Sequence, residues 1–376
     1  MNRIVLIGNG FDLAHGLNTK YEDFILWCLK QYGYNMLHTS SKEISDGLCS
    51  FKIKDKANIS TWASAFQGWY YKRENPLIPW DEMAAFFTAI EDRNLCDFSI
   101  TSPLFKRIWN RLLLGWVDIE NEYFSLLTEE KLTIDKGVIG ANYRELNCQL
   151  EILRDKLIQY LKLESEKAAP VIDNINDIIY RPIKKREISV AYKRSLGENV
   201  IENIIPCATM FLNFNYTKTS EKYLSESSNV MVNYIHGNLE DPESIIFGYG
   251  DELDSDFKKL QKMNDNECLR HIKSIRYLES DGYRKMLEFI ESDTFQVIIM
   301  GHSCGLSDRT LLNTLFEHKN CVSIKPYYYV NKEGKDNHLD IIQNISRNFT
   351  DMKLMRDRVV NKTFCEPFVN YKEMQE

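Results

Sequence analysis

The sequence predicts an α/β protein built on a parallel sheet, with a large helical insertion after the first strand and helix. Three observations support this: an apolar run near the amino terminus, several short apolar runs in the second half of the chain, and a long stretch of helical periodicity between them. Apolar runs that alternate with charged helical stretches are typical of parallel strands covered by helices on both faces. The first strand lies far from the others in sequence, which makes the helical stretch an insertion into one α/β domain.

The first strand is expected over residues 4–7, a continuous apolar run of the kind found in buried parallel strands. Gly8 and Gly10 follow it and indicate a sharp turn. Thr19 begins a T-x-x-E capping pattern, so a helix is expected over about residues 20–31.

The insertion is expected over residues 41–204 and to be mainly helical. Its clearest helical stretches are residues 82–93, 105–127 and 144–163. In the last of these, leucines recur at three- and four-residue steps and form one apolar face. The flanking residues 1–40 and 205–350 would form the discontinuous sheet domain, and residues 351–376 a carboxyl-terminal tail.

Five further strands are expected after the insertion. They are residues 208–214, 230–235, 244–250, 295–300 and 321–330. Charged helical stretches separate several of them, as in a sheet with helical crossovers.

Composition limits the classes of partner and the compartment. The net charge of −7 argues against generic nucleic-acid binding and against an anionic membrane surface. The basic run RPIKKRE, residues 181–187, is interpreted as a solvated loop. The nine cysteines never form C-x-x-C, which fits reduced thiols and predicts no metal site. The apolar run at the amino terminus is too short for a signal peptide or a membrane span, so a cytoplasmic protein is expected.

Three strand ends carry short polar motifs, each with a structural and a functional interpretation. Gly8 and Gly10 suit either a ligand phosphate or a tight turn without a ligand. Asn215, in FNYT, lies where α/β proteins bind ligands, although asparagine after a strand more commonly satisfies a turn. His236, in HGNL, suits a general base or a structural turn.

The stretch VIIMGHSCGLSD contains G-x-S-x-G between a predicted strand and a predicted helix, as in the nucleophile elbow of a serine hydrolase. In that fold the acid and then the histidine follow Ser303 in the chain. The residues available for these roles are Asp308, Asp336, Asp340, His318 and His338. No HGGG-like oxyanion loop precedes the serine, which makes the hydrolase the third-ranked interpretation.

Four stretches in this order, GNGFDLAHGL, FNYT, HGNL and GHSCGLSD, resemble the AbiH family of bacterial abortive-infection proteins that act against phage. The AbiH family is in turn similar to the sirtuin-like NAD-binding fold. The resemblance covers most of the chain and implies a Rossmann-like, sirtuin-like parallel sheet that binds NAD.

The resemblance also implies the residues of the site. Asn215 matches the sirtuin asparagine beside the nicotinamide ribose, and His236 matches the catalytic histidine. Gly8 and Gly10 would hold the pyrophosphate, and Ser303 would contact the adenosine half as a ligand-binding hydroxyl. The implied nucleotide-binding residues are Gly8, Asn9, Gly10, Phe11, Asp12, Gly301, His302, Ser303 and Asp308, the last toward a ribose.

The activity expected from the resemblance is hydrolysis of NAD to ADP-ribose and nicotinamide in anti-phage defence. Sirtuins carry paired C-x-x-C zinc cysteines that this chain lacks, so protein deacylation is not expected. A phage-derived trigger and a homo-oligomer are the expected partners besides the nucleotide. The alternative from another class is a nucleotide-binding sensor or scaffold of a defence system without turnover.

Overall fold

A computed structural model describes residues 1–38, 41, 43–54, 96–112, 118–129, 139–167, 169–196, 202–225 and 229–370. The chain forms two compact units. The sheet unit comprises Met1–Asn18 and Leu161–Glu376, and the insertion unit comprises Thr19–Tyr160. The helix expected over residues 82–93 lies outside the described residues.

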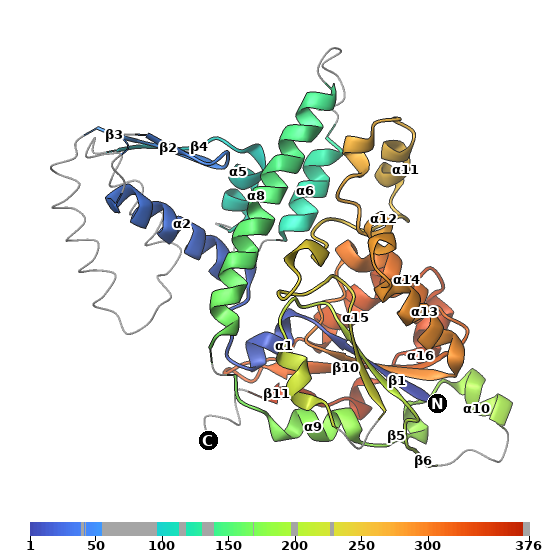
Figure 1. Ribbon diagram of the computed structural model, residues 1–376. Helices are drawn as coiled ribbons and strands as arrows, with labels where there is room; N and C mark the ends of the chain where they lie inside the picture. Colours follow the sequence, from blue (N-terminus) through green and yellow to red (C-terminus); the bar gives the residue numbers. More distant parts are fainter. Residues whose placement is uncertain are drawn as a thin grey trace. The chain divides into compact units, whose positions relative to one another are not determined.

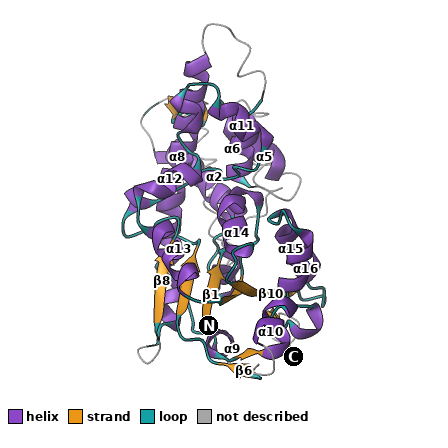
Figure 2. Ribbon diagram, turned by 90° about the vertical axis from the view of Figure 1, so that its right-hand side faces the viewer, coloured by secondary structure: helices purple, strands orange, loops and turns teal. Residues whose placement is uncertain are grey.

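The sheet unit is built on six parallel strands, which confirms the predicted α/β class. In sheet order they are β11 (Pro367–Asn370), β10 (Cys321–Val330), β9 (Phe295–Met300), β1 (Asn2–Ile7), β7 (Thr209–Asn213) and β8 (Val230–Tyr234). Each neighbouring pair is parallel. Figure 2 shows β8, β1 and β10 following one another across the sheet.

Helices cover both faces of this sheet, because side chains alternate between its two sides. In β1, Ile4 and Leu6 pack into one apolar cluster and Val5 and Ile7 into the other. The first cluster is completed by α13 (Gly282–Ser292), α14 (Arg309–Phe316), α15 (His338–Arg347) and α16 (Met352–Arg358). The second is completed by α1 (Asn9–Ala14) and α9 (Asp173–Tyr180). Figure 1 shows α9 on one side of the strands and α14 and α15 on the other.

The prediction of a strand over residues 244–250 is wrong. Pro242–Ser244 form a 3₁₀ turn, and the only ladder contact that follows is an isolated bridge between Tyr249 and Ile272. Ile245, Ile246 and Phe247 are buried, so the apolar run reflects packing and not strand pairing.

The boundaries of the two units differ from the boundaries of the predicted domains. The helix after the first turn, α2 (Tyr21–His38), belongs to the insertion unit, and residues 161–204 belong to the sheet unit. The reason for the latter is α9, whose apolar face completes the second core cluster. The predicted tail of residues 351–376 contains α16 and the edge strand β11.

The insertion unit is helical, with a small sheet that the sequence did not predict. Its further helices are α5 (Pro103–Leu112), α6 (Ile119–Leu127) and α8 (Ile139–Ser165), of which residues 161–165 are assigned to the sheet unit. Its antiparallel strands are β2 (Glu43–Ser45), β3 (Cys49–Ile53) and β4 (Cys96–Ile100). Within the described ranges, no helix has both the length and the apolar composition to cross a membrane.

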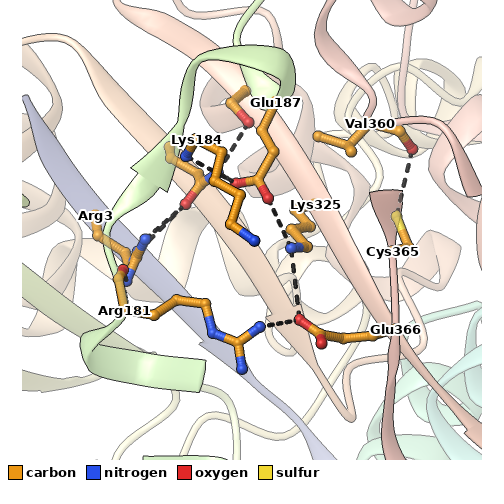
Figure 3. A network of polar contacts seen from close by, with 10 residues as sticks. Arg3, Arg181, Lys184, Glu187, Lys325, Val360, Cys365 and Glu366 are labelled. Carbon is orange, nitrogen blue, oxygen red and sulfur yellow. Dashed lines mark hydrogen bonds and ion pairs between the residues drawn. The ribbon is translucent and has the colours of Figure 1, made fainter. Parts of the chain in front are cut away.

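The basic run 181–187 packs against the parallel sheet and is not the solvated loop that the sequence predicted. It contains β5 (Ile183–Lys184), which pairs with β6 (Asn203–Ile204). Glu187 is buried, and its Oε1 lies 2.9 Å from the Nζ of Lys325 on β10 (Figure 3). We name the group of buried polar side chains around this pair the β10 network. Its members are Arg3, Glu187, Gln296, Ser323 and Lys325.

The remaining helices of the sheet unit are short. They are α10 (Val190–Leu196), α11 (Ser255–Gln261) and α12 (Lys273–Arg276). The last two lie between β8 and α13, in a part of the chain to which the sequence assigned no motif.

Candidate functional site

The four sequence motifs end at one edge of the parallel sheet. Gly8 follows β1, Asn215 follows β7 by one residue, His236 follows β8 by one residue, and Gly301 follows β9. Because the strands are parallel and adjacent, these residues lie at the carboxyl edge, where open α/β sheets bind their ligands. The sheet thus brings together segments that are up to about 290 residues apart in the chain.

The two glycine turns after β1 and β9 pack directly against each other. The N–H of Gly10 donates to the carbonyl of Gly301 at 2.8 Å. A Cβ on Gly8 would lie 2.5 Å from His302 Cα, and a Cβ on Gly301, which has φ +74°, would lie 2.1 Å from Phe11 N. The glycines are therefore required by the contact between these turns, whether or not a ligand also approaches them.

Phe11 and Asn9 occupy opposite environments in the first turn. The Phe11 ring is fully buried and packs against His15, Tyr223 and Phe368, so the ring belongs to the core. Asn9 is exposed.

Asp12 is a buried carboxylate beneath the same turn. Its Oδ2 accepts a hydrogen bond from Thr217 Oγ1 at 2.6 Å, whereas its Oδ1 has no hydrogen-bond partner among the described residues. Burial raises the pKa of Asp12 to about 6, against the opposite effect of the Thr217 hydroxyl. The carboxylate thus joins the first glycine turn to the FNYT segment.

Asn215 links the same two segments from the other side. Its Nδ2 donates to the carbonyl of Gly8 at 3.0 Å, and its N–H donates to Asn213 Oδ1 at 3.0 Å. The side chain is half-buried, so it lies at the border between the turns and the surface.

His236 is buried at the end of β8, with 4% of its surface exposed. The Phe214 ring meets it edge-on at 5.2 Å, and the Tyr277 ring stacks on it at 6.0 Å with its hydroxyl 3.2 Å from His236 Nε2. Burial, together with the charge of Lys273, lowers the pKa of His236 to about 3, although Asp308 acts in the opposite direction. The ring is therefore uncharged at neutral pH.

Asp308 is the centre of a buried ionic group. Its Oδ1 lies 2.8 Å from Lys273 Nζ and 3.4 Å from His236 Nε2, and its Oδ2 lies 3.6 Å from His302 Nε2. Burial raises the pKa of Asp308, but Lys273 and the two histidines outweigh it and hold that pKa below its ordinary value. We name these four residues the Asp308 cluster. The carboxylate that the resemblance assigned to a ribose is thus already engaged by protein groups.

The loop after β9 is held in an unusual conformation by α15 and the residue that follows it. Cys304 has φ +54°, a left-handed value that is rare for residues other than glycine. Asn344 Nδ2 donates to the Ser303 carbonyl and Asn348 Nδ2 donates to the Cys304 carbonyl, each at 2.8 Å. The Cys304 N–H donates to His302 Nδ1 at 3.0 Å, which leaves the His302 proton on Nε2, toward Asp308.

This geometry does not favour the nucleophile elbow. Left-handed backbone occurs at Gly301 and Cys304, on either side of Ser303, and Ser303 itself is exposed. Of the histidines that follow it, His318 pairs with Glu291 at 3.2 Å and His338 packs on Tyr328. In the described part of the chain neither histidine forms a hydrogen bond with Ser303.

Sequence reasoning missed Lys273, Tyr277, Asn344 and Asn348. Lysine and asparagine in charged helical stretches usually face solvent, and none of these four belongs to a motif, so a single sequence carries no signal for them. The site that results combines an uncharged imidazole, a carboxylate, a buried ammonium group and amides that are half-buried (Asn215, Asn344) or buried (Asn348). Among the residues that the structure describes, no cluster of three or more His, Cys, Asp or Glu side chains is arranged to hold a metal ion.

Comparisons with known proteins give one match. The model of the family described as Bacteriophage abortive infection AbiH matches residues 4–329, which include all four motifs and the Asp308 cluster. Neither a search of curated proteins nor a search of solved structures found a match.

Proposed function

Because the chain belongs to the Bacteriophage abortive infection AbiH family, and thus to a defence against phage, we propose that it binds NAD at the carboxyl edge of its sheet and hydrolyses it to ADP-ribose and nicotinamide. Loss of NAD would stop the metabolism of an infected cell. In this proposal the insertion unit holds the activity off until a phage-derived trigger arrives, or supplies contacts between copies of the chain.

One observation carries the proposal, namely the order of the strands around the glycine turns. From β1 the chain adds β7 and β8 on one side and then β9, β10 and β11 on the other, so the order reverses between β1 and β9. This is the strand order of dinucleotide-binding Rossmann folds, whose ligands bind at the point of reversal. The turns at Gly8 and Gly301 follow the two strands that flank this point.

Hydrolysis of NAD places modest demands on the protein. The bond between the nicotinamide nitrogen and ribose C1′ breaks with its electron pair passing to nicotinamide, while the oxygen of a water molecule bonds to C1′. The leaving group is already cationic, so no strong acid is needed. In the proposal Asn215 holds the ribose, and His236, being uncharged, accepts the proton of the water.

The structure changes the role proposed for Asp308. Its oxygens already face Lys273, His236 and His302, so we assign it to orienting His236 and not to binding a ribose. Gly8, Asn9 and Gly10 remain the proposed neighbours of the pyrophosphate, and Gly301, His302 and Ser303 those of the adenosine half.

A specific observation favours the second candidate function, a nucleotide-binding sensor or scaffold without turnover. His236 is 4% exposed and its pKa of about 3 makes it a weak base. A protein that binds the nucleotide at this edge of the sheet without using His236 as a base would not need a stronger base.

The purified full chain incubated with NAD separates the two functions. The wild-type protein is expected to release nicotinamide and ADP-ribose, and chromatography measures both products. Asn215→Ala is expected to abolish this release through lost ribose positioning and to weaken NAD binding in a calorimetric titration. Binding of NAD without product in the wild-type protein would favour the sensor, and absence of binding would contradict both.

A further inference from the structure

A lysine from a part of the chain without motifs reaches the candidate site. Lys273 begins α12 and is 1% exposed. Its main chain is fixed from both sides, because its N–H donates to the Tyr249 carbonyl at 2.8 Å and the Tyr249 N–H donates to the His271 carbonyl at 3.1 Å. A buried ammonium group is unfavourable unless it is paired, and Asp308 Oδ1 lies 2.8 Å from the Lys273 Nζ.

The same turn supplies a second contact to His236. Tyr277 follows Lys273 by four residues, and its hydroxyl lies 3.2 Å from His236 Nε2. Lys273 and Tyr277 thus approach the ring and its carboxylate together, as residues one helical turn apart do. The short segment 273–277 therefore contributes both a charge and a hydrogen-bonding hydroxyl to the surroundings of His236.

The charges that face His236 come from three elements. Lys273 lies on α12, Asp308 ends the 3₁₀ turn before α14, and His302 lies in the loop after β9. The Tyr277 hydroxyl also faces the ring. Lys273 and Asp308 act on the His236 pKa in opposite directions, Lys273 lowering it and Asp308 raising it.

We propose that Lys273 is a positioning residue of this site, which pairs with Asp308 and so adds to burial in disfavouring a charge on the His236 ring, while the Tyr277 hydroxyl orients that ring. The proposal rests on the proposed function for its catalytic consequence, since it is the uncharged ring that accepts the proton of the attacking water. In a His–Asp pair alone the carboxylate favours the protonated imidazole, which has no free electron pair on that nitrogen. Lys273 opposes this effect of the carboxylate, because its positive charge disfavours protonation of the ring.

The first test measures the protonation of His236 directly and needs no turnover. The chain has seven histidines, so the His236 ring signals can be assigned by NMR from the spectrum of a His236→Gln variant. In the wild-type protein the ring is expected to stay uncharged from about pH 8 down to about pH 5, because its pKa is about 3. In Lys273→Met the lowering by lysine is lost and the raising by Asp308 remains, so the titration midpoint is expected to rise by about one pH unit or more.

Matched variants make this test decisive. Lys273→Arg keeps the charge and is expected to titrate as wild type, and Lys285→Met, which removes an exposed lysine paired with Asp281, is the control for any loss of charge. Lys273→Gln serves as the second neutral variant if Lys273→Met does not fold. An unchanged His236 titration in the folded neutral variant would overturn the proposal.

The second test separates positioning from a purely structural role. The double variant Lys273→Met with Asp308→Asn removes both charges and restores neutrality. Its kcat for nicotinamide release is expected to fall about tenfold or more with KM for NAD little changed, because the ring loses its orienting pair. Wild-type kcat in a folded double variant would show that the pair serves only the fold. If the wild-type protein releases no nicotinamide, the proposed function fails, and the NMR titration still decides the role of Lys273.

Discussion

Two buried ionic groups of the sheet unit, the β10 network and the Asp308 cluster, differ in what they connect. In the β10 network, Lys325 on β10 pairs with Glu187, and Arg3 on β1 donates to Gln296 and to the carbonyls of Ile179 and Arg181 (Figure 3). These bonds fasten the segment after α9 to the sheet. Its charged members are Arg3, Glu187 and Lys325, and no histidine belongs to the network.

The Asp308 cluster has the same kind of lysine–carboxylate pair but adds two histidines. It lies where the strands end, beside backbone in left-handed conformations at Gly301 and Cys304. Histidine is the side chain whose protonation changes near neutral pH, and strained backbone often marks functional sites. Burial of charge alone therefore does not identify a site, whereas the combination of histidine, strand end and strain does.

The largest effect that this comparison predicts is on stability, in the β10 network. Lys325→Met leaves Glu187 buried without its cation and is expected to cost about 3–5 kcal/mol of unfolding free energy, measured by denaturant melts. Lys319→Met, which removes an exposed lysine paired with Glu291, is the control and should cost less than about 1 kcal/mol. NAD turnover per folded molecule should not change in either variant. If Lys325→Met is as stable as Lys319→Met, the β10 network does not stabilise the fold in the way that this comparison assumes.

The next effect is on turnover, in the Asp308 cluster. His236→Ala is expected to give a folded protein that still binds NAD, because the glycine turns and the loop after β9 remain. Its rate of nicotinamide release should fall roughly a hundredfold or more, the usual contribution of a general base. The measurement is product release at saturating NAD, with thermal melts to confirm folding. Full activity in this variant would exclude His236 as the base.

A smaller effect is expected at the contact between the glycine turns. The sequence alone predicts that a larger residue at Gly10 weakens nucleotide binding with little effect on folding away from the turn. The structure adds a cost in stability, because a Cβ there would lie 2.8 Å from Gly301 Cα and 2.9 Å from its carbonyl oxygen. Gly10→Ala should therefore lose about 1–3 kcal/mol in a denaturant melt. Gly305→Ala is the control, since its Cβ would have no neighbour closer than 3.6 Å; equal melts for the two variants would contradict the packing argument.

The smallest effect is expected at Ser303. Ser303→Ala should weaken NAD binding modestly and leave turnover at saturating NAD nearly intact, because the exposed hydroxyl lies outside the Asp308 cluster. Calorimetric titration and product release measure the two quantities. If Ser303→Ala were inactive and His236→Ala fully active, the result would support a serine hydrolase with Ser303 as its nucleophile instead.

The strand-end motifs were predictable from sequence because they combine two local signals. An apolar run that stops at glycine, asparagine or histidine marks both a buried strand and the turn after it, as in Ile4–Gly10 and in the FNYT and HGNL segments. Membership of the AbiH family was predictable for the same reason and is confirmed. The apolar run at residues 244–250 misled, because burial of Ile246 and Phe247 gives the same pattern as strand pairing.

By itself the sequence determined the α/β class, the parallel strands and the four turns, because each depends on the order of residues within a short window. Only the tertiary structure decided which side chains meet at those turns. It brought Lys273 and Tyr277 to His236, turned Phe11 into the core, and used the glycines for contact between Gly10 and Gly301. These contacts join residues that are distant in the chain and are determined by how strands and helices pack, and no local pattern records which residues will pack together.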